Sequence, residues 1–332
     1  MDEDDVRIRP SRGSRPRTKE RPAHGGAVTG VVVAVDRGRF TCRVGGRDVA
    51  AMKARELGRR GVVVGDRVAL VGDVSGGPDA LARIVRVEPR SSALRRTADD
   101  NDPVERVIVA NAEQLVVVAA LADPAPRLGL VDRCLVAAYD SGLSPLLCLT
   151  KADLASPDEV LATYRALDVD HVVVRRDRPL DELTEHLHDR VSVLVGHSGV
   201  GKSTIVNALV PGARRATGGV NLVTRRGRHT SSSAVALPLP IGGWVIDTPG
   251  LRSFGLAHVD VNRVIHAFPD LEAGTTECPR GCTHDEPECG LDEWVLSGHA
   301  DPTRLASLRR LLRTRETDED AAARREAEQD GP

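Results

Sequence analysis

Aromatic residues are scarce in this chain of 332 residues, which has three Phe, two Trp and two Tyr. Proteins that hold single-stranded nucleic acid by base stacking need several exposed rings, so extensive stacking surfaces are not expected here. The chain also lacks an excess of either charge: Lys and Arg number 46, Asp and Glu number 48, and the net charge is −2. This balance excludes a wholly basic coat protein but is compatible with local basic patches.

Long hydrophobic runs are missing as well. No apolar stretch approaches the ~18 residues that span a bilayer, and the opening MDEDDVRIRP is acidic, unlike a secretory signal. We therefore expect a soluble, cytoplasmic protein without membrane contact. A hydrophobic fraction of 41% is ordinary for a globular chain, and at ~150 residues per domain the length predicts two or three domains.

The N-terminal third separates into an arm and a small β-unit. Residues 1–26 are rich in Arg, Pro and Gly and poor in apolar residues, which predicts a disordered basic arm. Residues 27–92 contain five strand-like runs separated by Gly: VTGVVVAVD, RFTCRVGG, RDVAAM, GVVVGDRVALVG and ARIVRVEPR. This spacing predicts an OB-like β-barrel. Phe40 is its one aromatic residue, so any nucleic-acid binding would use basic side chains on the phosphate backbone.

Residues 99–257 alternate apolar strands with amphipathic helices. The strands are QLVVVAAL, PLLCLTKADL, HVVVR, VSVLVG and GGWVIDTPG. Continuous apolar strands between helices indicate a mostly parallel sheet that is covered on both faces. The rest of the chain is a Cys/His-containing segment at 258–315, with one long helix, and an acidic tail at 316–332. The predicted fold is thus multidomain, with an α/β core.

A phosphate-binding loop follows the strand VSVLV. The sequence GHSGVGKS matches GxxxxGK[ST] and opens a helix, which is the context that a P-loop requires. Its backbone N–H groups would surround a phosphate, the Lys would reach the β- and γ-phosphates, and the Ser hydroxyl would bind Mg²⁺. The predicted nucleotide-binding residues here are Gly196, His197, Ser198, Gly199, Val200, Gly201, Lys202, Ser203 and Thr204.

Two further motifs complete a guanine-nucleotide site. DTPG at 247–250 ends a strand, where Asp247 would hold Mg²⁺ and the Gly250 amide would sense the γ-phosphate. TKAD, formed by Thr150, Lys151, Ala152 and Asp153, follows another strand and is similar to the guanine-recognition motif of GTPases. Asp153 would accept hydrogen bonds from guanine N1–H and its 2-amino group. Adenine lacks this pair of donors and would leave the carboxylate unsatisfied.

The order of these motifs is unusual. In most GTPases the P-loop comes first, whereas here the guanine motif at 150 precedes the P-loop at 196 and DTPG at 247. The contacts between these motifs depend on which strands are neighbours in the sheet and not on their order in the chain, so the three motifs can still form a complete nucleotide site. This order predicts a circularly permuted GTPase domain.

A cluster of metal-binding residue types lies further along. Cys278, Cys282, His284 and Cys289 fall within CPRGCTHDEPEC, and Cys₃His is a closed tetrahedral ligand set for structural Zn²⁺. We predict one structural zinc ion here, the alternative being a set of free or redox-active thiols. The three other cysteines are isolated in apolar surroundings and are expected to be small buried hydrophobes: Cys42, Cys134 and Cys148.

The sequence resembles the RsgA/YjeQ family of GTPases that depend on the small ribosomal subunit. The resemblance rests on the barrel, on the Cys/His cluster and on the permuted motifs GHSGVGKST, GRHTSSS, DTPGLRSFGL and TKAD. The resemblance covers about residues 28–315. It implies hydrolysis of GTP to GDP and phosphate, stimulation by the small ribosomal subunit, and a role in late maturation of that subunit through rRNA binding. Three departures from the family pattern stand out. Arg175 and Arg176 occupy the usual Ser-Ala place, the family's GRHTTT stretch reads GRHTSSS, and the first and last gaps of the zinc cluster are one residue shorter.

The segment between the P-loop helix and DTPG would be the first switch. It carries five Arg and no acid over 211–230, which favours contact with rRNA. Leu251 is apolar and cannot orient water, so His229 is the nearest candidate catalytic residue; the alternative is that His229 only forms hydrogen bonds within its loop. The Mg²⁺-sensing hydroxyl lies among Thr230, Ser231 and Ser232, with Thr230 and Ser231 taken as candidates alongside Ser203 and Asp247.

Two alternative functions remain. The chain could be an RNA-binding assembly factor with weak or vestigial GTP turnover, which a lack of stimulation by small subunits would reveal. It could also be a P-loop ATPase or kinase, against which Asp153 argues. For the GTPase hypothesis the expected cofactors are GTP, Mg²⁺ and one Zn²⁺, and the expected state is a monomer. The last helix, DPTRLASLRRLLRTR, is expected to dock its Leu side and expose its Arg side.

Overall fold

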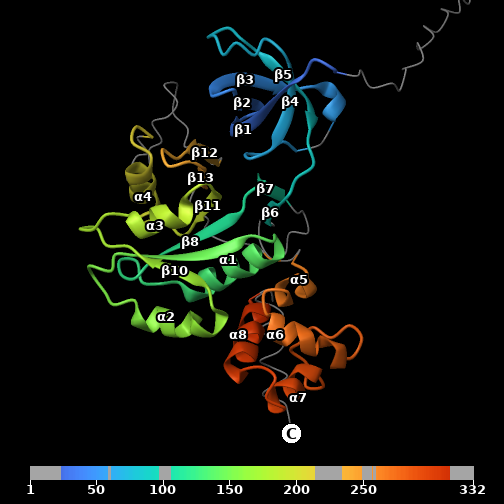
Figure 1. The fold of residues 1–332 in the computed structure, drawn as a ribbon, viewed down its shortest axis with the longest axis vertical. Coiled ribbons are helices and arrows are strands. Elements are labelled where there is room, and N and C mark those ends of the chain that lie inside the picture. Colours follow the sequence, from blue (N-terminus) through green and yellow to red (C-terminus); the bar gives the residue numbers. More distant parts are fainter. Residues whose placement is uncertain are drawn as a thin grey trace, which may run out of the picture.

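The computed structural model describes residues 24–58, 61–96, 106–213, 234–248, 256 and 259–314. Most of the predicted basic arm, the acidic tail and the predicted first switch lie outside these ranges. In Figure 1 the barrel and the C-terminal helices lie at opposite ends of the molecule, with the α/β sheet between them. The predicted division into domains at 27–92, 99–257 and 258–315 stays a prediction.

Five strands close the N-terminal barrel. They are β1 (Val28–Asp36), β2 (Arg39–Val44), β3 (Arg47–Lys53), β4 (Arg67–Gly72) and β5 (Ala82–Val87). Neighbouring strands follow the order β1-β2-β3-β5-β4, and β4 pairs with β1 to close the barrel. A 3₁₀ turn, Arg55–Leu57, follows β3. This closure confirms the predicted OB-like barrel. Phe40 is 7% exposed inside the barrel core, so its ring is not available to stack on a base.

The chain leaves the barrel through a two-stranded ladder, β6 (Ala93–Arg96) and β7 (Arg106–Ala110), which the sequence patterns had not indicated. This ladder lies close to the barrel wall. A Cβ on Gly65 would stand 1.9 Å from the carbonyl oxygen of Ala110, and Gly65 has a φ of +90°. Asn111 Nδ2 donates to the Gly65 carbonyl at 2.8 Å. Only glycine permits this close backbone approach.

The central sheet is mostly parallel, as predicted. Strands β10 (Asp170–Val173), β9 (Ser144–Thr150), β8 (Gln114–Ala120), β11 (Val191–Val195) and β13 (Trp244–Asp247) lie side by side in that order and run parallel. Strand β12 (Val235–Pro238) adds an antiparallel edge beyond β13. Strand β12 was not predicted, because it is only four residues long and one of its two neighbours, β1, belongs to the barrel.

Residues of these strands alternate between two cores. On β8, Val117 and Ala119 join a core with helices α1 (Leu128–Asp140) and α2 (Asp158–Tyr164). Val116 and Val118 join a second core with α3 (Asp181–Leu187) and α4 (Lys202–Leu209). A 3₁₀ turn, Arg165–Leu167, follows α2. The strands are therefore buried on both faces.

The barrel is joined to the central sheet through an edge strand. Ala34 of β1 pairs antiparallel with Val235 of β12, so barrel and sheet form one continuous array of 11 strands. Beside this junction, the Arg43 guanidinium lies 5.6 Å from the ring centre of Trp244 and pairs with Asp48 at 2.6 Å. Arg43 is thus engaged within the protein. Arg47 and Arg55, by contrast, are exposed on the barrel.

The C-terminal segment is helical. It consists of α5 (Val261–Ile265), α6 (Pro269–Glu272), a 3₁₀ stretch (Ala273–Glu277), α7 (Gly290–Leu296) and α8 (Pro302–Arg313). As expected, α8 buries its leucines, and they join the core beneath α1: Leu305, Leu308, Leu311 and Leu312. None of the helices in the described ranges is long and apolar enough to cross a membrane.

The expectation that α8 exposes its arginines is wrong for Arg309. Its side chain is 21% exposed and pairs with Asp292 through two hydrogen bonds of 2.8 and 2.6 Å. Arg310 reaches the other way, to Asp132 of α1 at 3.2 Å. These arginines therefore hold α8 to its neighbours, which a helical-wheel pattern cannot reveal.

The three isolated cysteines are buried, as predicted, and burial raises the pKa of each thiol to about 12: Cys42, Cys134 and Cys148.

Candidate nucleotide and metal sites

The P-loop lies between β11 and α4. Gly196 has a φ of +150°, and a Cβ there would stand 2.3 Å from the Val118 carbonyl oxygen. Gly201 has a φ of +99° and is the N-cap of α4. Both positions therefore require glycine. The turn presents backbone amides at a helix N-terminus, which is the environment that a phosphate prefers.

Lys202 is buried in this loop. Its ammonium donates to the carbonyls of Gly196 and, at 3.0 Å, of His197. Burial lowers the pKa of Lys202, while the carboxylate of Asp247 acts in the opposite direction. A cation at the center of a phosphate-binding turn provides the charge complement that a triphosphate needs. Ser203 is half-buried and Thr204 is exposed on the first turn of α4.

Strand pairing brings Asp247 to the same edge. Asp247 is 5% exposed, and its Cα pairs in register with Leu194 of β11, two residues before the P-loop begins. The hydroxyl of the following residue, Thr248, donates to the Leu194 carbonyl at 2.8 Å. The carboxyl ends of β11 and β13 are therefore fixed beside each other. The Ser203 hydroxyl on the first turn of α4 and the Asp247 carboxylate at the end of β13 are oxygen ligands of the kind that Mg²⁺ prefers.

The TKAD loop meets the P-loop directly. Thr150 ends β9, and its hydroxyl donates to the Val200 carbonyl of the P-loop at 2.6 Å. Lys151 has a φ of +60° and its ammonium donates to the carbonyl of Asp123, in the loop after β8. Ala152 is half-buried, and the exposed Asp153 accepts a hydrogen bond from the Arg176 backbone N–H at 3.3 Å. Motifs separated in the sequence thus converge at one sheet edge.

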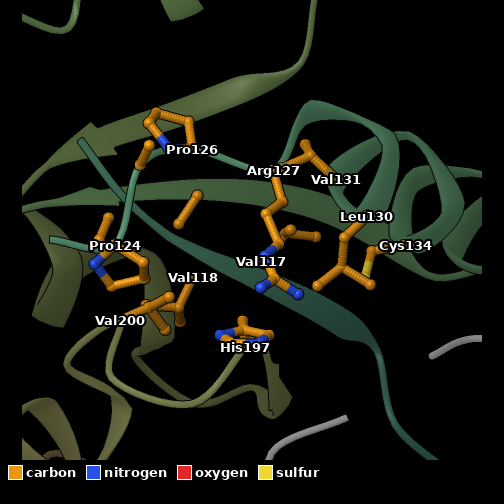
Figure 2. Close-up of a pocket in the computed structure, with 14 residues that line it drawn as sticks. Val117, Val118, Pro124, Pro126, Arg127, Leu130, Val131, Cys134, His197 and Val200 are labelled. Carbon is orange, nitrogen blue, oxygen red and sulfur yellow. The ribbon is translucent and has the colours of Figure 1, made fainter. Parts of the chain in front are cut away.

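A small pocket lies beside the P-loop (Figure 2). It is enclosed by the P-loop, by the segment 124–127 and by α1, and its walls include Pro124, Pro126 and Leu130. Figure 2 shows the Arg127 side chain extending toward the imidazole of His197. Sequence reasoning missed Arg127 because it belongs to no motif and only the packing of α1 brings it near the P-loop.

Several predicted site residues lie outside the described residues, and their roles remain predictions: His229, Thr230, Ser231, Ser232, Gly250 and Leu251, together with the arginines of the first switch.

The Cys/His cluster converges in three dimensions. The ligand atoms of Cys278, Cys282, His284 and Cys289 all lie within 4.8 Å of one another. Cys278 Sγ stands 3.6 Å from His284 Nδ1 and 3.9 Å from Cys289 Sγ. Zinc–sulfur bonds of ~2.3 Å in a tetrahedron place two sulfurs ~3.8 Å apart, so this geometry fits a zinc ion. Burial lowers the pKa of His284, which favours the neutral imidazole that binds metal.

Two arginines of helix α8 contact the segment that carries the Cys/His cluster. Arg309 Nε donates to the His284 carbonyl at 2.9 Å while its fork holds Asp292 of α7. Arg313 pairs with Asp285 at 2.9 Å. Arg309 thus holds the backbone of the ligand residue His284, and Arg313 holds the residue that follows it.

Fold and site together define a class of protein: a circularly permuted P-loop GTPase with an N-terminal barrel and a C-terminal Cys₃His segment. The chain belongs to the RsgA GTPase family, whose family model matches residues 87–257. A relative from Gemmatimonas aurantiaca, named small ribosomal subunit biogenesis GTPase RsgA, is 36% identical over 280 residues, covering 82% of this chain and 89% of that protein. The protein of the same name from Chlorobaculum parvum is 37% identical over 299 residues, covering 86% and 95%.

Solved structures agree on the fold. YjeQ from Thermotoga maritima superposes with a TM-score of 0.63 at 24% identity, covering 87% of this chain and 98% of that one. YloQ, described as a circularly permuted GTPase, gives a TM-score of 0.61 at 22% identity, covering 89% and 98%. The predicted family and fold class are thereby confirmed.

Proposed function

We propose that this protein hydrolyses GTP to GDP and phosphate with Mg²⁺ and acts in the biogenesis of the small ribosomal subunit, which stimulates the hydrolysis. The observation that carries the proposal is the meeting of three separate motifs at one sheet edge. Thr150 of TKAD bonds to the P-loop, and Asp247 pairs in register beside the strand that leads into it. Relatives named as small ribosomal subunit biogenesis GTPases support the cellular role.

Different residues of the site would bind the phosphates, the Mg²⁺ ion and the guanine base. Lys202 and the P-loop amides would bind the β- and γ-phosphates, and Asp153 would select guanine. Ser203 and Asp247 would hold Mg²⁺, which neutralises phosphate charge when bound. His229 would orient the attacking water. The Cys₃His set has four protein ligands and leaves no open position, so we assign its zinc a structural role.

We further propose that the partner surface is rRNA, which the protein meets as a monomer in the cytoplasm. The exposed Arg47 and Arg55 of the barrel support phosphate contacts, since such contacts need accessible cations and no aromatic stacking. The buried position of Phe40 is consistent with this mode.

The test is multiple-turnover phosphate release with and without purified small subunits. Stimulation is expected. Subunits that bind the protein but leave its turnover unchanged would favour the binding-only assembly factor instead. Competition against labelled GDP adds a second arm, in which GTP should displace the label far better than ATP does. Equal displacement by ATP would overturn the guanine assignment at Asp153.

Nucleotide state should also control subunit affinity. The segment after Asp247 leads from the γ-phosphate site toward the zinc-binding helices, so loss of that phosphate is expected to change their arrangement. Small-subunit affinity should be higher with a non-hydrolysable GTP analogue than with GDP. Equal affinity in both states would refute this coupling even if hydrolysis occurs.

A further inference from the structure

Two consecutive arginines follow β10, in the turn beside the TKAD loop. The two segments are tied by their main chains: Val174 N–H donates to the Leu149 carbonyl at 2.7 Å, and Ala152 N–H donates to the Val174 carbonyl at 3.3 Å. The turn after β10 therefore has a fixed position against the loop that carries Asp153.

Arg175 makes three hydrogen bonds in this turn. Its Nε and Nη2 donate to the two carboxylate oxygens of Asp177 at 3.0 and 3.2 Å. Its Nη1 donates to the Ala152 carbonyl at 3.2 Å. The Arg175 and Asp177 side chains are 43% and 60% exposed, so the pair itself contributes little to stability. Its effect is geometric, because the fork fixes the guanidinium plane with one N–H aimed at the TKAD backbone.

The held carbonyl belongs to the residue just before Asp153. On the other side, Arg176 N–H donates to Asp153 Oδ1 at 3.3 Å. Asp153 is thus fixed twice, through the backbone that precedes it and through one carboxylate oxygen. Each carboxylate oxygen has two acceptor sites, so both can still receive a donor from a ligand. A carboxylate with a fixed orientation loses less conformational freedom when it binds two adjacent donors.

We propose that Arg175 is a positioning residue for base recognition: paired with Asp177, it holds the TKAD loop so that Asp153 presents both oxygens to guanine. This inference rests on the proposed function, because it takes Asp153 as the guanine acceptor. Arg175 acts through the loop and touches neither phosphate nor Mg²⁺. Its loss weakens nucleotide binding without slowing the chemical step.

The test measures fluorescent GDP and IDP binding together with steady-state GTP hydrolysis. Arg175→Ala is expected to weaken GDP binding about three- to tenfold, the size of one lost hydrogen bond, and to raise KM while kcat is retained. IDP lacks the 2-amino group, so the preference for GDP over IDP should shrink. Arg178→Ala is the matched control, because it removes the same charge from the same turn. Within the described ranges the Arg178 side chain makes no hydrogen bond to the TKAD loop, so this variant should bind GDP like wild type.

Two more variants separate geometry from charge. Asp177→Asn breaks the paired fork and should weaken GDP binding in the same direction as Arg175→Ala. Arg175→Lys should fail to restore affinity, because an ammonium cannot fork between a carboxylate and a carbonyl. Full restoration by Lys, or equal losses in Arg175→Ala and Arg178→Ala, would overturn the proposal.

Asp153→Asn distinguishes this inference from the proposed function. It should lose GDP affinity more strongly than Arg175→Ala does. Wild-type GDP affinity in Asp153→Asn would refute the guanine site itself. Loss in Asp153→Asn with no change in Arg175→Ala would refute only the role of Arg175.

Discussion

The hydrogen bond from Thr150 to the P-loop provides the sharpest test of how the nucleotide site is assembled. Thr150 and Val200 are each 4% exposed, and the hydroxyl lies 2.6 Å from the Val200 carbonyl. Thr150→Val keeps the volume of the side chain but removes the donor, leaving a buried carbonyl without this partner. Such a loss costs about 1–3 kcal/mol.

Thr150→Ser is the matched control. It retains the hydroxyl and removes one methyl group, which packs against the P-loop close to Gly201, where an added Cβ would lie 3.9 Å from Thr150 Cγ2. Thr150→Ser is expected to lower the free energy of unfolding by about 0.8 kcal/mol. Urea unfolding followed by tryptophan emission measures both variants. Because the bond also joins the guanine loop to the phosphate loop, Thr150→Val should weaken GDP binding about fivefold or more, while Thr150→Ser stays near wild type. If Thr150→Val matches wild type in both assays, the two loops are not held together by this bond.

Other substitutions separate phosphate chemistry from metal support. Lys202→Ala or Ser203→Ala should abolish GTP hydrolysis with little change in the unfolding transition, since both act on phosphate and Mg²⁺; wild-type turnover would refute the site. Cys282→Ala, or treatment with a strong chelator, should remove the bound zinc and weaken small-subunit binding while GDP affinity is retained; a full zinc content in the variant would contradict the ligand set. Arg309→Ala should speed the loss of zinc to a chelator about tenfold. Arg313 is more exposed, so Arg313→Ala should speed zinc loss by a smaller factor. The reverse order would show that the hydrogen bond from Arg309 to the His284 carbonyl does not stabilise the zinc site.

Local patterns predicted those parts of the fold that depend on short stretches of sequence. Each of the five barrel runs contains a strand, because short apolar stretches between glycines favour strands joined by turns. The P-loop was predictable from spacing alone, because GxxxxGK[ST] after a strand requires glycines at Gly196 and Gly201, and both have positive φ values. The permuted order was predictable since motif order is directly legible.

Features set by distant contacts were not predictable. Strand β12 is short and pairs with β13 and with the barrel, so its own sequence carries little signal. Arg309 looked like a surface residue on a helical wheel, yet Asp292 and the His284 carbonyl draw it inward. Similarly, Arg175 was notable only as a departure from the family pattern, and its contact with the Ala152 carbonyl emerges from the pairing of β9 with β10.

The pairing of β1 with β12 has a consequence for dissecting this protein into fragments. A GTPase fragment that begins after the barrel would lose the neighbour that Ala34 provides to Val235 and would present an open strand edge to solvent. Open edges recruit strands from other chains, so such a fragment is prone to self-association. If such a fragment showed low activity, aggregation would explain the result as well as the loss of RNA contacts would. Point substitutions at Arg47 and Arg55, which leave the edge covered, are the cleaner way to test the barrel.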